Sequence, residues 1–320
     1  MHMLVLAAFS LVPLAAAAQS YPVKPIRIIS GQPTGNSSDF AIRAIAPVMS
    51  NNLGQPVLVE NRQAAGGRLA AEAVKNAPPD GYVLLLSASS AMVSATYLVK
   101  DVPYQTLTDF TPITKLLTVP TVVAIHSSIP AQTFPELLNY ARKFPGKLAF
   151  GSTGFGTVFH MTGEMLAIDH GIQWLHVPYS SGGLGVVVTD LASNRIQVFF
   201  PSISSLAPVL KGGNVKVIAV LDKQRLKLLP DVPAINEHYP NFTGLPSWFG
   251  VFGPHGLPQA IVSRLNTELR VSLHRPEIVS RLEAMASIPI GGTPEDFAQE
   301  LKINIAQMGK LTNTLGIKPE

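Results

Sequence analysis

The chain has 320 residues, of which 47% are hydrophobic and 14% charged, a balance typical of globular proteins with a sizeable core. It contains no cysteine, which excludes disulfide frameworks, cysteine-ligated metal sites and thiol nucleophiles. The formal net charge of +4 comes from 24 Lys and Arg against 20 Asp and Glu, without a long basic run. We therefore expect no nucleic-acid partner, because the usual electrostatic basis for one is missing.

The N-terminal segment has the texture of a secretory signal peptide. Residues 4–18 form an uncharged apolar run that is too short for a membrane span. Ala16-Ala17-Ala18 supplies small residues for a signal peptidase, so we predict cleavage near Ala18 and a periplasmic mature protein. Met1-His2-Met3 lacks the usual basic residue, which we interpret as a true start that lies upstream.

From Ile26 onward, short apolar runs alternate with amphipathic ones, which indicates βαβ units and parallel sheets covered by helices. The predicted strands are residues 26–29, 57–60, 82–86, 119–125, 147–150, 173–177, 196–200, 215–220 and 248–252. The predicted helices are residues 39–53 (capped by Ser37 or Ser38), 133–143, 157–170, 183–193 and 204–211, then helices that begin at Pro258, Pro276 and Thr293-Pro294.

Two apolar stretches, residues 119–126 and 247–254, are interpreted as paired crossovers between two α/β lobes. On this reading, residues 19–122 and 252–320 form the first lobe, and residues 123–251 form the second. Loops at the carboxyl ends of strands carry the ligand groups of open parallel sheets, so we expect the binding site in the cleft between the lobes.

Two loops are the main candidates for anion binding. Residues 30–39 follow the first strand, and residues 151–157 follow the strand predicted at 147–150; each leads directly into a helix. Amides at such a helix start stabilise an anion by about 0.3–1 kcal/mol through the helix dipole. An ordinary capped turn remains the alternative for the first loop. The second loop is no dinucleotide fingerprint, because Phe159 occupies the third glycine position and no Walker lysine follows.

Other candidate residues are less specific. Tyr179 lies in a third strand-to-helix loop that could close one wall of the cleft, and Trp248 lies on the second crossover, where core packing is the alternative to ligand contact. His160 and Glu164 are four residues apart, but a third metal ligand is missing from the pattern. We expect no cofactor and no metal. An exported hydrolase of small esters or amides, using Ser152 and His160, stays open as an alternative function.

An ordered series of motifs resembles the Bug family, the periplasmic solute-binding proteins of tripartite tricarboxylate transporters. The matching segments are Tyr21-Pro22, Pro25-Ile26-Arg27, Leu53-Gly54-Gln55-Pro56-Val57, Val59-Glu60-Asn61-Arg62, Ala65-Gly66-Gly67, Pro79-Asp80-Gly81-Tyr82, Asp109-Phe110, Pro145-Gly146-Lys147-Leu148, Gly151-Ser152, Gly154, Gly156-Thr157, His160, His176-Val177-Pro178-Tyr179, Leu229-Pro230-Asp231-Val232-Pro233 and Trp248-Phe249-Gly250. They span essentially the whole mature chain.

The resemblance implies a two-lobed Venus-flytrap fold, non-enzymatic capture of a small organic acid in the periplasm, and delivery to membrane subunits of the transporter. It also implies that the two glycine-containing loops hold the ligand carboxylate, partly through ordered waters. A receptor that signals to a sensor kinase is a further alternative. We expect the protein to be a monomer.

Departures from the family pattern bear on the ligand. Pro33-Thr34-Gly35-Asn36 replaces a Pro-Gly-Gly core, Ala91-Met92 replaces Thr-His, and Ser180 replaces a lysine. Gln197 and Pro201 stand at positions that are acidic in relatives, and Phe155 adds an apolar surface. These changes favour a monocarboxylate or an aromatic acid over citrate. The expected ligand-binding residues are Gln32, Thr34, Gly35, Asn36, Ser37, Ser89, Ser152, Thr153, Phe155, Gly156, Thr157, His160, Tyr179, Ser202 and Trp248.

Overall fold

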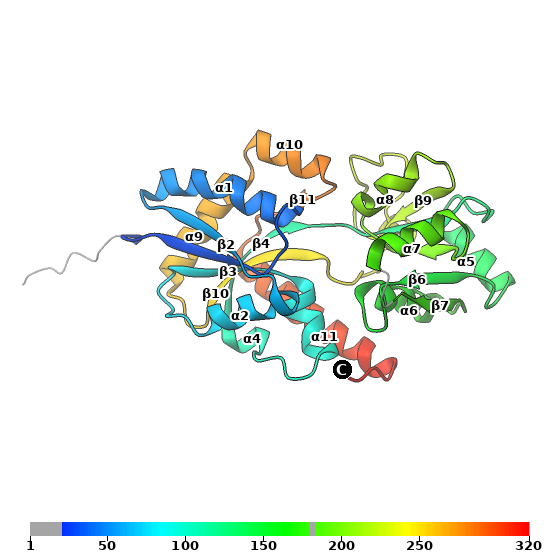
Figure 1. The fold of residues 1–320 in the computed structure, drawn as a ribbon, viewed down its shortest axis with the longest axis horizontal. Coiled ribbons are helices and arrows are strands. Elements are labelled where there is room, and N and C mark those ends of the chain that lie inside the picture. The colour runs from blue at the N-terminus through cyan, green and yellow to red at the C-terminus, as the bar shows by residue number, and fades with distance from the viewer. Residues whose placement is uncertain (1–20, 180–182, 320) are drawn as a thin grey trace, which may run out of the picture.

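The fold consists of two α/β lobes, each built around its own sheet (Figure 1). It is taken from a computed structural model that describes residues 21–179 and 183–319. The predicted signal peptide, residues 1–18, and Ser180 lie outside the described residues. The first sheet has six strands in the order β11-β4-β10-β3-β1-β2, and the second has five in the order β7-β6-β8-β5-β9.

The first lobe places helices on both faces of its sheet, because apolar side chains alternate across the strands. Its strands are β1 (Ile26–Ser30), β2 (Val57–Asn61), β3 (Val83–Ala88), β4 (Phe110–Thr118), β10 (Trp248–Pro254) and β11 (Ile288–Pro289). One face packs against α1 (Ser37–Leu53), α9 (Gln259–Leu273) and α10 (Pro276–Ala284), and the other against α2 (Arg68–Lys75) and α11 (Pro294–Thr314).

The second lobe repeats this arrangement on a smaller sheet. Its strands are β5 (Val122–His126), β6 (Ala149–Ser152), β7 (Leu175–Pro178), β8 (Val198–Phe199) and β9 (Val215–Val220). One face packs against α5 (Phe134–Lys143) and α6 (Val158–His170), and the other against α7 (Gly183–Ala192) and α8 (Ile203–Leu210).

Both sheets are mixed, which corrects the expectation of parallel sheets. β1 pairs in parallel with β2 and β3, but β10 runs antiparallel between β3 and β4. In the second lobe, β5 is antiparallel to both β8 and β9. β4 was absent from the sequence prediction, and Pro112 explains why, since proline cannot donate to a sheet ladder. A register shift between Val251 and Phe252 of the partner strand accompanies that proline.

The chain passes between the lobes through two adjacent segments. β4 ends at Thr118, which pairs with Trp248 at the start of β10. Just beyond, the Val119 amide donates to the Ser247 carbonyl at 2.9 Å, and the Ser247 hydroxyl donates to the Val119 carbonyl at 2.7 Å. All of β10 belongs to the first sheet, including residues 248–251, which the sequence analysis assigns to the second lobe. We propose that the lobes divide at this hydrogen-bonded pair.

Side-chain caps set where the helices begin. Asn36, and not Ser37 or Ser38 as predicted, is the cap of α1, since its Oδ1 accepts from the Asp39 amide at 2.8 Å. The predicted start near Thr133 is confirmed, because its hydroxyl accepts from the Glu136 amide. Thr157 caps α6 in the same way. These caps fix the two loops that precede α1 and α6.

Replacing Asn36 with alanine removes the side-chain cap of α1. We expect the free energy of unfolding to fall by about 1 kcal/mol, the usual cost of losing such a cap. Urea denaturation measures the change, with Ser37→Ala as the matched control, because no side-chain hydrogen bond of Ser37 is among those of the described residues. Equal effects of the two substitutions would contradict the role of Asn36.

Candidate functional site

The loop between β6 and α6, residues 152–157, is held by its own hydroxyl groups. The Ser152 hydroxyl donates to the Gly154 carbonyl at 2.9 Å, accepts from the Gly154 amide at 3.1 Å and lies 2.6 Å from His176 Nε2. The Thr157 hydroxyl also donates to the Gly154 carbonyl, at 2.8 Å. Because these two hydroxyl protons are used within the protein, the donors left for an anion here include the Thr153 hydroxyl and the first amides of α6, at Val158 and Phe159.

Four aromatic rings pack beneath and beside this loop. His176 is stacked between Phe150, at a centroid distance of 4.9 Å, and His160, at 4.1 Å. Phe155 meets the edges of both imidazoles, 5.3 Å from His160 and 4.9 Å from His176. Phe155 is nevertheless 71% exposed, so its outer face is available to a ligand.

Burial keeps both imidazoles neutral near pH 7. It lowers the pKa of His176 to about 4, with the nearby His160 as a second cause, and it also lowers the pKa of His160. His160 Nε2 lies 3.8 Å from Glu164 Oε1, and burial raises the pKa of that carboxyl group. Within residues 21–179 and 183–319, no group of three His, Asp or Glu side chains could hold a metal ion.

The loop between β1 and α1 is organised by a buried carboxylate. Asp39 accepts from the Gly35 amide at 3.0 Å, from Asn61 Nδ2 at 2.9 Å and from Arg43 Nε at 3.1 Å. Burial would raise the pKa of Asp39, but hydrogen bonds from Asn61 and Gly35 and the charge of Arg43 outweigh it and hold the pKa below its usual value. Asp39 therefore shapes this loop from behind and stays ionised while it does so.

The same loop packs against the turn that precedes α2. A Cβ atom at Gly31 would lie 2.8 Å from the Gly67 Cα atom, so only glycine permits this contact. Gln32 is buried, and its carbonyl accepts from Asn61 Nδ2 at 3.1 Å. Figure 1 shows the N-terminal end of α1 pointing toward the second lobe.

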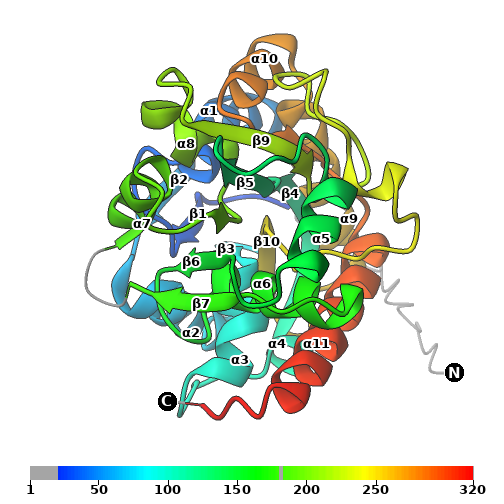
Figure 2. The ribbon, with the colours of Figure 1, turned by 90° about the vertical axis from the view of Figure 1, so that its right-hand side faces the viewer.

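A cavity of about 980 Å³ lies between the lobes. Its second-lobe wall is Thr153, Phe155, Gly156, Thr157, Val158 and Phe159. Its first-lobe wall is Gly66, Arg68, Ser90, Ala91, Ser94, Ala95, Leu98, Val99 and Lys100, with residues 316–319. Figure 2 shows this C-terminal segment beside α3 (Ala95–Leu98).

The charged side chains that line the cavity are all positive among the described residues. Its lining contains the cations Arg68, Lys100 and Lys318, and among the lining residues that the structure describes there is no aspartate or glutamate. Hydroxyl groups of Thr153, Thr157 and two serines add polar contacts, and the remaining wall is mostly apolar. Such a lining attracts a small anion with an apolar body.

The structure brings together part of the predicted site. Thr153, Phe155, Gly156 and Thr157 line the cavity. Ser152 and His160 are buried and do not line the cavity. They hold the loop in place, because Ser152 accepts a hydrogen bond from the Gly154 amide and His160 accepts one from the Gly156 amide. The residues predicted from the first loop do not line this cavity as it is described; they are Gln32, Thr34, Gly35, Asn36 and Ser37.

Four other predicted residues have structural partners elsewhere. Ser89 donates to the Pro246 carbonyl at 2.8 Å, beside the lobe connection. The Tyr179 hydroxyl donates to Asp190 at 2.7 Å, and Ser202 bonds with Ser205 near the start of α8. Trp248 is 2% exposed and donates to Asn304 Oδ1 at 2.8 Å, which is the core-packing alternative for this residue.

The first-lobe wall was missed by sequence reasoning. Ala65-Gly66-Gly67, cited only as a family motif, forms a turn (η1, Ala64–Gly67) in which all three residues have positive φ, and Arg68 follows it at the start of α2. That unusual run of left-handed residues was the available signal. Lys100 and Lys318 carry no local sequence signal, because only the fold brings the segment after α3 and the chain's C-terminal segment to the cavity.

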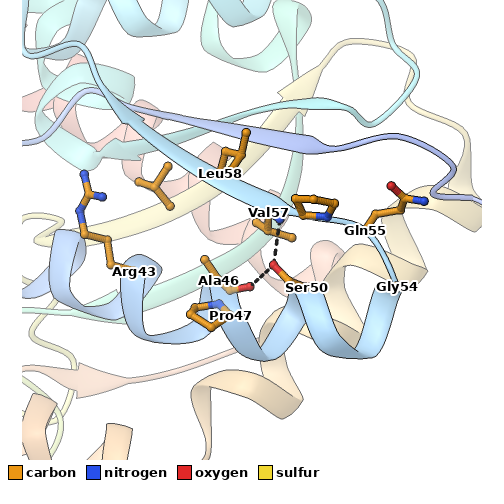
Figure 3. A pocket seen from close by; sticks show the side chains of 10 residues that line it. Arg43, Ala46, Pro47, Ser50, Gly54, Gln55, Val57 and Leu58 are labelled. Atoms are coloured by element: carbon orange, nitrogen blue, oxygen red, sulfur yellow. Dashed lines mark hydrogen bonds between the residues drawn. The ribbon is translucent and has the colours of Figure 1, made fainter.

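A second hollow, of about 700 Å³, lies on the outer side of the first lobe (Figure 3). It is bounded by α1 and the edge strand β2, with Arg43, Pro47 and Gln55 in its lining. The Ser50 hydroxyl links the two elements, because it donates to the Ala46 carbonyl at 2.8 Å and accepts from the Val57 amide at 2.9 Å. None of the predicted ligand-binding residues lines this hollow as described, so the cavity between the lobes is the candidate site.

The alternative of a hydrolase requires Ser152 and His160 to be hydrogen-bonded to each other, and the structure does not pair them. The imidazole partner of Ser152 is His176, whereas His160 Nδ1 accepts from the Gly156 amide at 3.0 Å. A nucleophile and base pair also needs a group that orients the base. His176 Nδ1 is buried, and no described residue gives it a hydrogen-bond partner.

Two α/β lobes joined by adjacent strands, with a cationic cavity between them, define a bilobal solute-binding protein. Residues 41–317 match the family described as "Tripartite tricarboxylate transporter family receptor", and the chain belongs to that family. It is therefore a periplasmic solute-binding receptor of the Bug type, and not a member of an enzyme family.

Known proteins of this kind are similar over most of their length. BugT of Bordetella pertussis is 31% identical over 281 residues, which cover 87% of this chain and 85% of BugT. Rpa4515 of R. palustris, solved with adipate, is 28% identical with a TM-score of 0.72, covering 94% of this chain and 100% of that one. MatC of Rhodopseudomonas palustris, solved with malate, is 27% identical with a TM-score of 0.67, covering 91% of this chain and 99% of MatC.

No helix among residues 21–179 and 183–319 combines the length and the apolar character that crossing a membrane would require.

Replacing Ser152 with alanine removes the hydroxyl that braces the second loop. We expect the free energy of unfolding to fall by about 1–3 kcal/mol, because the buried Gly154 amide and His176 each lose a partner. Chemical denaturation measures the loss, with Ser127→Ala on an exposed turn as the control. A change no larger than that of the control would show that the hydroxyl does not brace the loop.

Proposed function

We propose that the receptor captures a small organic carboxylate between its lobes and delivers it to the membrane subunits of a tripartite tricarboxylate transporter. The cavity between the lobes carries this proposal, because it offers Arg68, Lys100 and Lys318 without an acidic side chain among its described lining residues. The first amides of α6 face the same anion from the second lobe. The adipate and malate complexes of two similar proteins support an organic acid as the ligand class.

An aromatic acid or a monocarboxylate suits this cavity better than citrate. Phe155 presents an exposed ring, and Leu98, Val99 and Phe159 add apolar wall. These apolar parts of the wall offer no partner to a further carboxylate that lies against them, and burying an ionised carboxylate without a partner is costly. A benzoate-like ligand instead places one carboxylate among cations and amides and its ring against Phe155.

Ligand capture acts on the balance between open and closed lobes. A ligand that touches both walls stabilises the closed form by its difference in affinity for the two forms. The hydrogen-bonded pair Val119 and Ser247 is the proposed pivot, since the chain crosses between the sheets only around this point within the described residues. In this proposal the protein works as a monomer in the periplasm, and the closed form is what the membrane subunits recognise.

A ligand panel tests the proposed class. Mass spectrometry of the small molecule that co-purifies gives the first candidate, and thermal shifts with benzoate, phenylacetate, adipate, malate and citrate rank the acids. A true ligand at 100 times its dissociation constant adds about 2.7 kcal/mol of stability. We expect the aromatic acids to give the largest shifts. Stabilisation by citrate alone would overturn the ranking, and no shift with any acid would overturn the function.

Arg68 is expected to contact the ligand carboxylate from the first lobe. Arg68→Gln should weaken binding by about 1.5–3 kcal/mol, the range for a hydrogen bond to a charged group. Calorimetry with the best acid of the panel measures the loss. Arg62→Gln is the matched control, because Arg62 is exposed, lies outside the described lining of the cavity and pairs with Glu60 at 3.8 Å. Equal losses in the two variants would indicate a general charge effect instead of a contact.

A further inference from the structure

The shape of loop 152–157 depends on which nitrogen of His160 is protonated. His160 Nδ1 lies 3.0 Å from the Gly156 amide nitrogen, and an amide can only donate, so Nδ1 must be the unprotonated nitrogen. A proton on Nδ1 would set two donors against each other and release Gly156. Gly156 lines the cavity with Thr157, so this hydrogen bond acts directly on the ligand-facing wall.

His176 supports the same loop from the other side of the ring stack. Its Nε2 lies 2.6 Å from the Ser152 hydroxyl, which in turn bonds with both polar groups of Gly154. Its Nδ1 is buried without a partner among the described residues. Protonation would therefore create a buried N–H group that lacks an acceptor among the described residues, which is unfavourable.

The two rings cannot both take up protons without conflict. Their centroids are 4.1 Å apart and their planes differ by 25°, so two imidazolium charges would face each other at contact distance. Phe150 covers the other face of His176, and Phe155 lies T-shaped to both imidazoles, at their edges. The charged group that faces the pair is Glu164, whose Oε1 lies 3.8 Å from His160 Nε2 and favours a first proton on His160.

We propose that His160 and His176 are positioning residues that hold loop 152–157 in its ligand-facing shape only while both rings are neutral, so that acid weakens the receptor's grip on its anion. The statement about the loop stands on the contacts above, and the statement about the anion rests on the proposed function. The pair thereby couples solute capture to the proton concentration outside the inner membrane.

The direction of the effect follows from the low pKa of the rings. Between the ordinary histidine pKa of about 6.5 and the value of about 4 for His176, the unfolded chain binds protons that the folded chain does not. The free energy of unfolding therefore falls as the pH drops through this window and levels off below it. The hydrogen bond to Gly156 is lost when His160 is protonated, and burial places that protonation below the ordinary histidine pKa.

Amide exchange of Gly156 measures the state of the loop without any ligand. In the wild-type protein, we expect its protection factor to fall about tenfold or more between about pH 7.5 and about pH 4, as His160 takes up a proton on Nδ1. Long-range ¹H–¹⁵N spectra of the imidazoles should show the Nε2–H tautomer of His160 at the higher pH. In His160→Asn, the Asn Oδ1 can replace Nδ1 as the acceptor and does not titrate, so protection should persist in acid. His255→Asn, on an exposed turn, should behave as the wild type does.

Binding of benzoate, or of the best acid of the panel, gives the functional readout over about pH 5–8. The dissociation constant should rise with acid in the wild type and stay nearly flat in His160→Asn. If the protection factor of the Gly156 amide in the wild type did not change with pH, the proposal would be overturned. Tighter binding in acid that His160→Asn abolishes would also overturn it, because an imidazolium would then attract the anion directly. If no acid binds while Gly156 still titrates, the proposed function fails and the positioning role of the pair stands.

Discussion

The antiparallel pairing of β4 with β10 is the constraint on which the rest of the structure depends. Because Thr118 pairs with Trp248, the chain leaves the first sheet and returns to it at one point, and Val119 and Ser247 hold that point together. The chain crosses between the two sheets only here within the described residues, so the proposed rotation of the lobes would leave the pairing within each sheet intact. That rotation would change the width of the cavity and keep its lining residues, as the proposed capture of a solute requires.

The proposed anion site combines two kinds of group that the fold supplies in different ways. In the second lobe, a strand-to-helix loop presents the first amides of α6, and its own hydroxyls and two imidazoles keep it in shape. In the first lobe, three cations come from segments that are distant in sequence, at Arg68, Lys100 and Lys318. Rigid amides set the position of a carboxylate, while flexible cations adapt to what carries it.

The sequence predicts local structure well where one signal dominates. Thr133 caps a helix where its spacing to Glu136 indicates, Thr157 lies at the predicted start of another helix and caps it, and the apolar runs of β1, β3 and β9 lie close to their predicted places. β4 was not predicted, because Pro112 and Lys115 interrupt its apolar pattern, and only pairing with β10 makes it a strand. The cap of α1 was assigned to serine neighbours of Asn36, since asparagine and serine both favour that position.

Of the two walls of the candidate site, only the second-lobe wall could be predicted from the sequence. Its second-lobe loop has glycines and hydroxyls in sequence, and these lie against the cavity. The first-lobe wall is assembled from a turn, two short helical segments and the segment after α11, and no periodicity or motif links them. Trp248 shows the opposite error, because an aromatic residue on a crossover strand is equally suited to the core, and its indole is buried against Asn304.

The position of residues 316–319 has a practical consequence for anyone who produces this receptor. The family match ends at residue 317, yet Lys318 and Pro319 still border the cavity. A peptide appended to the C-terminus would continue from residues that border this cavity, where a run of histidines could occupy the entrance or shift the charge there. Purification handles therefore belong near the start of the described chain, because the segment that leads into β1 lies on the side of the first lobe away from the second lobe (Figure 1).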